Sequence, residues 1–427
     1  MPQSKNAIPG PDNITRVVFD NGITVLVREN HAAPVTVLEG CLSAGSIFDS
    51  VGKTGLSSFV TSMLTRGSTH YDFDTFNETI ESIGASLGIG SDTHSSSFSA
   101  TSLSEDFPTI VHVLADILRR PTFPAEHIER LRGQKLVHLQ ERDQDTQQVA
   151  NYRFYEKIYG DHPYGRPTSG YLETINAIQR DDLTTFYEQH YTPNGAIIVV
   201  VGDVQTAAVL DLLHEQLGDW QGAPVVQPVA PLRPHQQHEQ HYYPIPGKVQ
   251  TDIMLGCLAV ARHDPDFYTV RVANTILGQF GMMGRLGEQV REVQGLAYYC
   301  GSSVDTDLQA GIWYASAGVN PENVPQAIDS ILAEFARLGS EFVADDELSD
   351  SQAYLTGVLP LTLETNDGVA SALINIERYG LGLDYLQRYN ALIYGVTRAD
   401  IQRVAKRYLQ TDSYTLVVAG PPEAEEA

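Results

Sequence analysis

A weak internal repeat is the feature of this sequence that most limits its possible folds. The stretch IQRDDLTTFYEQHYTPNGAIIVVVG, residues 178–202, matches VTRADIQRVAKRYLQTDSYTLVVAG, residues 396–420. Both copies place an apolar stripe with helical spacing before an apolar strand. Far upstream of each copy, near the starts of the two expected domains, Gly-Cys-Leu recurs at 40–42 and 256–258. Matches in the same order at both ends of the unit indicate a duplication, so we expect two similar domains.

A proline-rich segment separates the two copies. Residues 221–241, QGAPVVQPVAPLRPHQQHEQH, carry four prolines, which disfavour helices and central strands. This composition predicts a semi-extended linker. We therefore place an N-terminal domain at 14–220 and a C-terminal domain at 242–421.

Within each half, helix and strand patterns are mixed. Asn21-Gly22 between alternating apolar runs predicts a β-hairpin near the N-terminus. In the first half, a buried strand follows at 34–46, strands lie near 86–102, and helices are predicted at 52–66, 73–84, 105–119 and 124–159. In the second half, the pattern predicts strands at 249–259, 296–306 and 311–319, with a helix at 265–280. The expected fold class is α+β, with two homologous sandwich-like domains built on mixed, mostly antiparallel sheets.

The charge balance and the cysteines limit the partners and the compartment. The formal net charge is −25, with 53 acidic against 28 basic residues, which repels nucleic acid and favours basic or neutral partners. No run approaches the ~18 apolar residues of a membrane helix, and the N-terminus has no secretory pattern. Cys41, Cys257 and Cys300 form no CxxC pair, so buried free thiols are expected. These features favour the cytoplasm, or the periplasm if a signal peptide was removed.

The predicted helix at 52–66 presents two faces. Its buried stripe consists of Leu56, Phe59, Val60, Met63 and Leu64. Three hydroxyl residues, Ser58, Thr61 and Ser62, share another face at i, i+3 and i+4. This spacing is how one helix presents two metal ligands and a general base together.

The segment GKTGLSSFVTSMLTRGS, residues 52–68, resembles the region around the inverted zinc motif H-x-x-E-H of the pitrilysin/insulinase family, which includes mitochondrial processing peptidase. The framing apolar and glycine residues are all present. However, Ser58 and Ser62 stand at the positions of the histidine ligands, and Thr61 at that of the glutamate base. The family's spacing to its third ligand, a glutamate, leads to His138. Hydroxyl groups bind Zn²⁺ poorly and no carboxylate remains to activate water, so we expect this chain to bind no metal or other cofactor.

A second resemblance lies in the C-terminal half, in LGQFGMMGRLGEQVREVQGLAYYCGSS, residues 277–303. It is similar to the family segment whose arginine and tyrosine donate hydrogen bonds to the substrate carbonyl near the scissile bond. Arg291 and Tyr298 hold these positions. A guanidinium and a phenol are suitable fixed donors for a developing oxyanion. Without the resemblance, an arginine near a helix C-terminus and a tyrosine in a strand are ordinary structural residues.

The resemblance implies that the chain is half of a clamshell-like chamber. Its partner would be a homologous subunit that carries H-x-x-E-H and zinc, and the heterodimer would cut peptides or short unfolded polypeptides. In this interpretation the chain is inactive alone and contributes Arg291 and Tyr298 to proteolysis at the partner's metal. Three alternatives stay open: a scaffold subunit similar to the core proteins of the respiratory cytochrome complex, a homodimeric peptide-binding chamber, and an active peptidase that uses His138 with His112 or His162.

Overall fold

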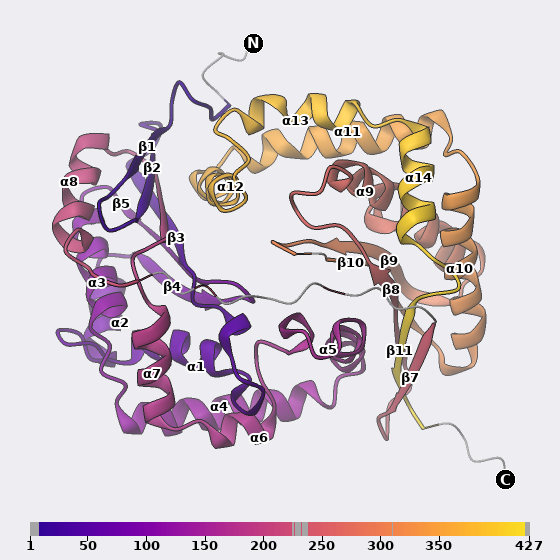
Figure 1. Cartoon of the computed structure of the whole chain (residues 1–427), viewed down its shortest axis with the longest axis horizontal. Coiled ribbons are helices and arrows are strands. Elements are labelled where there is room, and N and C mark those ends of the chain that lie inside the picture. The colour runs from indigo at the N-terminus through magenta and orange to yellow at the C-terminus, as the bar shows by residue number, and fades with distance from the viewer. Residues whose placement is uncertain (1–7, 224–225, 227–231, 233–237, 310, 423–427) are drawn as a thin grey trace. The chain divides into compact units, whose positions relative to one another are not determined.

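The computed structural model describes residues 8–223, 226, 232, 238–309 and 311–422 (Figure 1). The chain divides into two compact units, and neither unit is continuous in sequence. Unit 1 consists of Met1–Leu139, Pro167–Pro228 and Pro360–Arg388. Unit 2 consists of Gln140–Arg166, Val229–Leu359 and Tyr389–Ala427.

Unit 1 is built on a six-stranded sheet with the order β1-β2-β6-β3-β5-β4. The strands are β1 Thr15–Val18, β2 Thr24–Glu29, β3 Val35–Leu42, β4 Ser86–Ser91, β5 Ser96–Leu103 and β6 Ile197–Gly202. The β2–β6 pair is parallel, and the other pairs are antiparallel. Every residue of the central strand β6 is buried, as its uninterrupted run of valine and isoleucine predicts for a strand covered on both faces. Helices of this unit include α1 Leu56–Met63, α2 Phe73–Ser82, α3 Phe107–Arg119, α6 Leu172–Ala177, α7 Arg180–His190 and α8 Thr206–Leu217.

Unit 2 repeats this plan with five strands in the order β7-β11-β8-β10-β9. The strands are β7 Glu239–Pro244, β8 Thr251–Leu258, β9 Ala297–Asp305, β10 Ile312–Val319 and β11 Thr415–Gly420. Again one pair, β7–β11, is parallel, and the other pairs are antiparallel. Helices of this unit include α9 Phe267–Asn274, α10 Val324–Ser340 and α14 Arg398–Tyr408. The shared strand order and pairing directions confirm the predicted duplication and the α+β fold class.

Each unit contains one helix that comes from the other half of the sequence. Helix α5, Thr146–Tyr159, comes from the first half of the sequence but packs on β8 and β11 of unit 2. Helix α12, Asn366–Arg378, comes from the second half and packs on β3 and β6 of unit 1. The sequence division at 14–220 and 242–421 therefore differs from the compact units. The predicted linker, 221–241, falls largely outside the described residues, and its last residues already belong to β7.

Three predicted helices are interrupted or shortened in the structure. The helix predicted at 52–66 is α-helical only over α1, with short 3-10 turns at Val51–Lys53 and Leu64–Arg66. The prediction of a single helix at 124–159 is wrong, because α4, Ala125–Arg142, ends before α5 begins. The side chain of Asp145 starts the second helix by accepting a hydrogen bond from Gln148 N at 2.8 Å, and an aspartate at this position favours a new helix. Likewise, the predicted helix at 265–280 consists of α9 followed by a π-helical turn at Thr275–Gln279.

Several local predictions are confirmed. The Asn21-Gly22 turn joins β1 to β2, with Gly22 in the left-handed region at φ 89°, which glycine adopts without a steric cost. The three cysteines are buried and free. Among the residues that the structure describes, none of the helices combines the length and apolar character needed to cross a membrane.

Candidate functional site

The first candidate region is helix α1 of unit 1, whose N-terminus is tightly fixed. Gly55 precedes the helix with φ 95°, and a Cβ there would lie 2.7 Å from Ile175 Cδ1. The buried carboxylate of Asp49 accepts hydrogen bonds from Gly55 N at 2.8 Å and Ser57 N at 2.9 Å. A carboxylate at this end satisfies backbone N–H groups that have no partner within the helix and complements the helix dipole. The position of the three hydroxyl residues on α1 is therefore well defined.

The three hydroxyls of the degenerate motif have different surroundings. Thr61 is buried, and its Oγ1 donates to Ser57 O at 2.9 Å and lies 2.8 Å from the phenol oxygen of Tyr191. Ser62 Oγ donates to Ser58 O at 2.8 Å, within the same helix. The half-buried Ser58 has a side chain as its partner, since its Oγ accepts a hydrogen bond from Lys135 Nζ at 2.9 Å.

Lys135 is a residue of this site that the sequence interpretation missed. It lies on α4, one turn before His138, which is exposed on the same helix. Burial lowers the pKa of the Lys135 amine to about 8, although the Asp49 carboxylate opposes part of this effect. The amine also lies 5.7 Å from the centre of the Phe59 ring. The sequence does show a lysine one helical turn before His138. However, only the tertiary structure shows that the amine of this lysine reaches α1.

This set of side chains does not fit a zinc ion. Hydroxyl groups replace the imidazoles, and the amine of Lys135 occupies the side of α1 that presents Ser58. Zinc favours imidazole, thiolate or carboxylate ligands, and an ammonium group repels a dication. Among the residues that the structure describes, no group of three or more His, Cys, Asp or Glu side chains could hold a metal ion.

The two histidines of the alternative metal set have other partners in their own units. His112 Nδ1 lies 2.5 Å from Pro108 O of its own helix. The buried His162 belongs to unit 2, where its Nε2 lies 3.2 Å from Gln309 Oε1. In the described part of the chain, neither histidine belongs to a group of three or more His, Cys, Asp or Glu side chains that could hold a metal ion.

The second candidate region is in unit 2, where both predicted site residues lie on irregular backbone. Arg291 belongs to a π-helical segment, Gly287–Val293, a conformation found frequently at functional sites. Its side chain is 42% exposed, and its Nε lies 3.6 Å from Glu292 Oε1. Gly295, with φ 63°, ends this segment by donating from its N to Arg291 O at 3.0 Å. The Arg291 guanidinium is thus accessible to solvent, and a hydrogen bond fixes the backbone that carries it.

Tyr298 lies at a β-bulge between β9 and β10. Tyr299 pairs with Gly318 and Ala297 pairs with Val319, so that Tyr298 is the extra residue without a partner in the ladder. Its side chain is exposed, and its hydroxyl donates to Asn320 Oδ1 at 3.0 Å. Bulges of this kind redirect side chains and occur often beside active sites. The structure therefore presents the Tyr298 phenol to solvent from a defined position.

The residue after the bulge is fixed by a buried carboxylate. Tyr299 donates its hydroxyl to Asp252 Oδ1 at 2.6 Å, and Thr146 Oγ1 donates to Asp252 Oδ2 at 2.5 Å. Asp252 is only 1% exposed, so these hydrogen bonds compensate for its loss of water. The Tyr299 ring passes over Gly318, where a Cβ would lie 2.4 Å from Tyr299 Cε1. Side-chain packing thus fixes the bulge that orients Tyr298.

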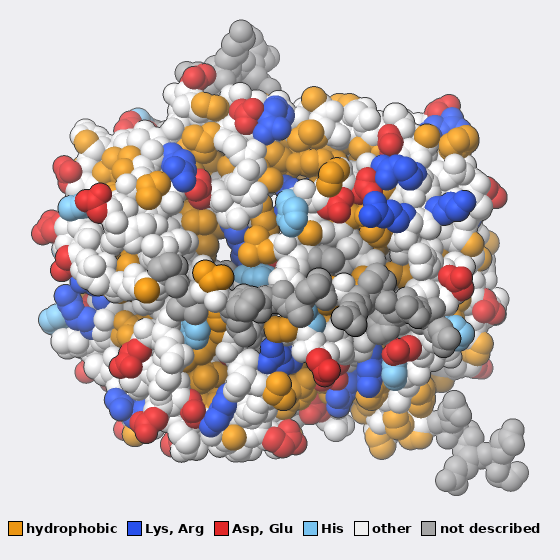
Figure 2. Space-filling model, in the orientation of Figure 1, with side chains coloured by type: hydrophobic (Ala, Val, Ile, Leu, Met, Phe, Trp, Pro, Cys, Tyr) orange, Lys and Arg blue, Asp and Glu red, His pale blue; other side chains and the backbone are white. Residues whose placement is uncertain are grey.

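The face shown in Figure 2 has no single large patch of one charge among the residues drawn in colour. Acidic and basic side chains are interspersed there, with hydrophobic side chains between them. A net charge of −25 still gives the whole chain a negative potential. Val293, at the end of the Arg291 segment, and Met282 and Met283, in the turn before it, have exposed apolar side chains.

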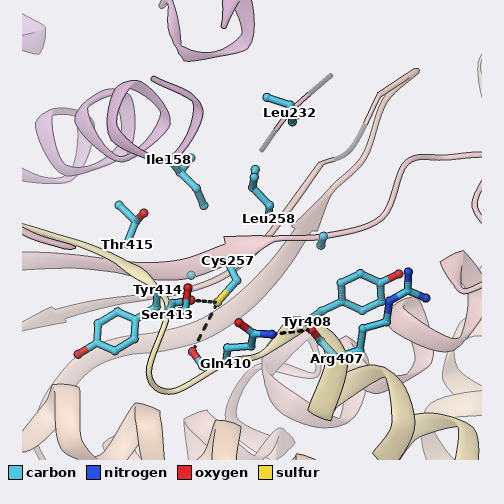
Figure 3. A pocket seen from close by; sticks show the side chains of 12 residues that line it. Ile158, Leu232, Cys257, Leu258, Arg407, Tyr408, Gln410, Ser413, Tyr414 and Thr415 are labelled. Atoms are coloured by element: carbon cyan, nitrogen blue, oxygen red, sulfur yellow. Dashed lines mark hydrogen bonds between the residues drawn. The ribbon is translucent and has the colours of Figure 1, made fainter. Parts of the chain in front are cut away.

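A cavity of about 250 Å³ in unit 2 has a cysteine, Cys257, in its lining (Figure 3). Cys257 Sγ lies 3.5 Å from Ser413 O and 3.7 Å from Gln410 O. Burial raises the pKa of this thiol to about 11, so it stays protonated at neutral pH and is a poor nucleophile. The cavity is therefore a weaker candidate than the two regions above.

Family models match most of the chain. The model of the insulinase family (peptidase family M16) matches residues 24–171, and the model of the peptidase M16 inactive domain matches residues 177–355. Degenerate positions Ser58, Thr61, Ser62 and His138 fall in the first region, and Arg291 and Tyr298 in the second.

Individual relatives cover nearly the whole chain at low identity. An uncharacterized zinc protease of Streptomyces coelicolor is 25% identical over 98% of this chain and 92% of its own length. Mitochondrial-processing peptidase subunit beta of Pongo abelii is 25% identical over 96% of this chain and 85% of its own length. A peptidase M16 inactive domain from Pseudomonas fluorescens has a similar structure, with a TM-score of 0.91, 24% identity, and coverage of 97% of this chain and 99% of that chain. A protease from Helicobacter pylori gives a TM-score of 0.90 at 18% identity, over 97% of this chain and 100% of that chain.

Proposed function

Because the chain belongs to the insulinase (peptidase M16) family, we propose that it is a subunit without zinc that completes the active site of a zinc-binding homologue. The contrast between its two candidate regions carries this proposal. In unit 1, hydroxyls and His138 stand where the family resemblance predicts ligands and a base, and one of these hydroxyls, that of Ser58, accepts a hydrogen bond from Lys135. Unit 2 presents both Arg291 and Tyr298 to solvent on a fixed backbone.

The chemistry proposed for unit 2 is stabilisation of negative charge. Hydrolysis of a peptide bond at the partner's metal converts the substrate carbonyl into a tetrahedral oxyanion. The Tyr298 phenol and the Arg291 guanidinium would donate hydrogen bonds to this oxygen, and fixed donors stabilise the transition state more than the substrate. The Tyr298 hydroxyl would exchange its bond to Asn320 for one to the oxyanion.

The proposed partner is a family member that carries H-x-x-E-H and zinc. The relatives named as subunits of mitochondrial-processing peptidase support an association of this kind. The exposed Met282, Met283 and Val293 beside Arg291 offer an apolar surface for such a partner. The substrates would be peptides or short unfolded polypeptides, and the net charge of −25 would favour basic segments. The three buried free thiols are compatible with the cytoplasm as the place of action.

The test is cleavage of a quenched fluorescent peptide by this chain, by its H-x-x-E-H partner, and by the mixture. We expect activity only in the mixture, sensitive to a zinc chelator and greatly reduced by Tyr298→Phe in this chain. Chelator-sensitive turnover by this chain alone would contradict the proposal. Partner activity that does not respond to this chain would favour the scaffold role, and peptide binding without turnover by a homodimer would favour the binding chamber.

A further inference from the structure

Ser58 and Lys135 form a hydroxyl–amine pair between α1 and α4. The two atoms lie 2.9 Å apart, and both side chains are partly buried. Other hydroxyls of α1 are engaged differently: Ser57 bonds to Ala44 O and the Ser91 hydroxyl, and Thr61 contacts Tyr191. Ser58 is thus distinguished from these neighbours by having a titratable base as its partner.

The two atoms are close enough for activation of the serine: when the Lys135 amine is neutral, the hydrogen bond reverses and the Ser58 hydroxyl donates to Nζ. A serine hydroxyl is a weak nucleophile unless an adjacent base accepts its proton, and the two groups must lie within hydrogen-bond distance. A lysine can be that base when removal from water favours its neutral form. The surroundings of Lys135, with the Phe59 ring 5.7 Å away, lower its pKa to about 8. About one amine in ten is therefore neutral at pH 7.

We propose that Ser58 and Lys135 form a zinc-independent nucleophilic site that reacts with small activated esters and phosphonylating reagents. Ser58 Oγ would bond to the carbonyl carbon as the C=O π electrons move onto the carbonyl oxygen, while the Ser58 proton moves to the neutral Lys135 Nζ. The C=O bond then re-forms, the bond from this carbon to the leaving oxygen breaks, and the leaving group takes the proton from Nζ. With a fluorophosphonate, Ser58 Oγ bonds to phosphorus, fluoride leaves, and Nζ gives the proton to water. A water molecule repeats the sequence on the acylated serine, which releases the acid and restores both side chains.

The substrate class follows from the contacts of Ser58. An amide needs strong stabilisation of its oxyanion and protonation of its amine, whereas an activated ester has a leaving group that departs readily. The Ser58 hydroxyl accepts a hydrogen bond from the Lys135 amine, and the Ser58 carbonyl accepts one from Ser62 Oγ. The amine supplies the base that reaction with an activated ester requires. This inference goes beyond the proposed function and does not depend on a partner subunit, since both groups lie in unit 1.

The test is labelling of the full chain with a fluorophosphonate probe in the presence of a metal chelator, followed by mass-spectrometric mapping. We expect a single adduct on Ser58 and slow hydrolysis of p-nitrophenyl acetate. Ser58→Ala should abolish both. Lys135→Arg retains the charge but removes the base, because arginine stays protonated, and should reduce both at least tenfold. Ser82→Ala is the matched control on α2, where the exposed serine hydroxyl donates to Thr79 O of its own helix, and it should change neither rate.

Lys135→Met provides a second test in case arginine does not fit between the helices. It should also reduce labelling at least tenfold while circular dichroism confirms that the chain is folded. An absence of any adduct on Ser58 in the wild-type chain would overturn the inference. An adduct that forms on Ser58 equally fast in the folded lysine variants would do the same, because the amine would then have no role as a base.

Discussion

Replacing Lys135 by methionine is expected to stabilise unit 1 at neutral pH, and the size of the effect can be worked out from the burial of the amine. The pKa of Lys135 falls from 10.5 to about 8 in the fold, with burial as the main cause. Each tenfold change in proton affinity corresponds to about 1.4 kcal/mol. The charged amine is therefore disfavoured by about 3 kcal/mol in the folded chain relative to the unfolded chain.

The pH dependence follows from the direction of this change. Because the folded chain binds the Lys135 proton less tightly than the unfolded chain, deprotonation relieves the cost, and stability rises with pH between about 8 and 10.5. The full cost is present at pH 7, and about 2 kcal/mol of it is relieved by pH 9.5. Methionine has no charge to bury and keeps most of the apolar stem. The stability gained by Lys135→Met at pH 7 is smaller than the cost of burying the charged amine, because the substitution also removes the hydrogen bond to Ser58.

The assay is urea denaturation of the wild-type chain and Lys135→Met at pH 7 and pH 9.5. The difference in free energy of unfolding between Lys135→Met and the wild type should change by about 2 kcal/mol between these pH values. Taking this difference cancels the contributions of all other titrating groups, because both proteins share them. Lys406→Met is the matched control, since Lys406 is exposed on α14. If Lys135→Met and the wild type show the same pH dependence, the amine is not desolvated and the reasoning fails.

Three further predictions concern the other sites. In the mixture with a zinc-binding partner, Tyr298→Phe should lower kcat about 10²-fold with little change in KM, and steady-state kinetics will measure this; an unchanged kcat would remove the phenol from the chemistry. Gly55→Ala should destabilise the chain by about 2 kcal/mol or more in thermal or chemical unfolding, because φ 95° and the 2.7 Å approach to Ile175 both oppose a Cβ. Cys257 should react with iodoacetamide far more slowly than a model thiol at pH 7.5, because its pKa is raised to about 11; equal rates would show an exposed thiolate.

Local sequence patterns predicted much of the fold. The Asn21-Gly22 turn, the buried strands and the repeat at 178–202 and 396–420 each correspond to elements of the structure. These predictions succeed because turn chemistry and apolar periodicity are properties of neighbouring residues. The identities at Ser58, Thr61 and Ser62 were equally visible, since the degenerate motif occupies one short helix.

Features that depend on contacts between distant residues could not be predicted. The Lys135 amine meets Ser58 only because α4 packs beside α1. The bulge at Tyr298 adds one residue to β9, and an alternating pattern cannot show this without knowledge of the register with β10. The break at Asp145 was hidden because the apolar pattern continues on both sides of it. Helices α5 and α12 carry no local signal of the sheet on which they pack.

The exchange of α5 and α12 has a consequence for how this molecule could be divided. A protein cut between the repeats would give two fragments, each lacking the helix that covers part of its own sheet and retaining one that belongs on the other. Expressed separately, each fragment would leave buried strands such as β6 or β11 partly uncovered, which favours aggregation. Co-expressed, they should reconstitute a native complex without a covalent connection. The two halves of the sequence therefore depend on each other to fold. A single repeat would be soluble only if the helix that covers its sheet were added from the other repeat.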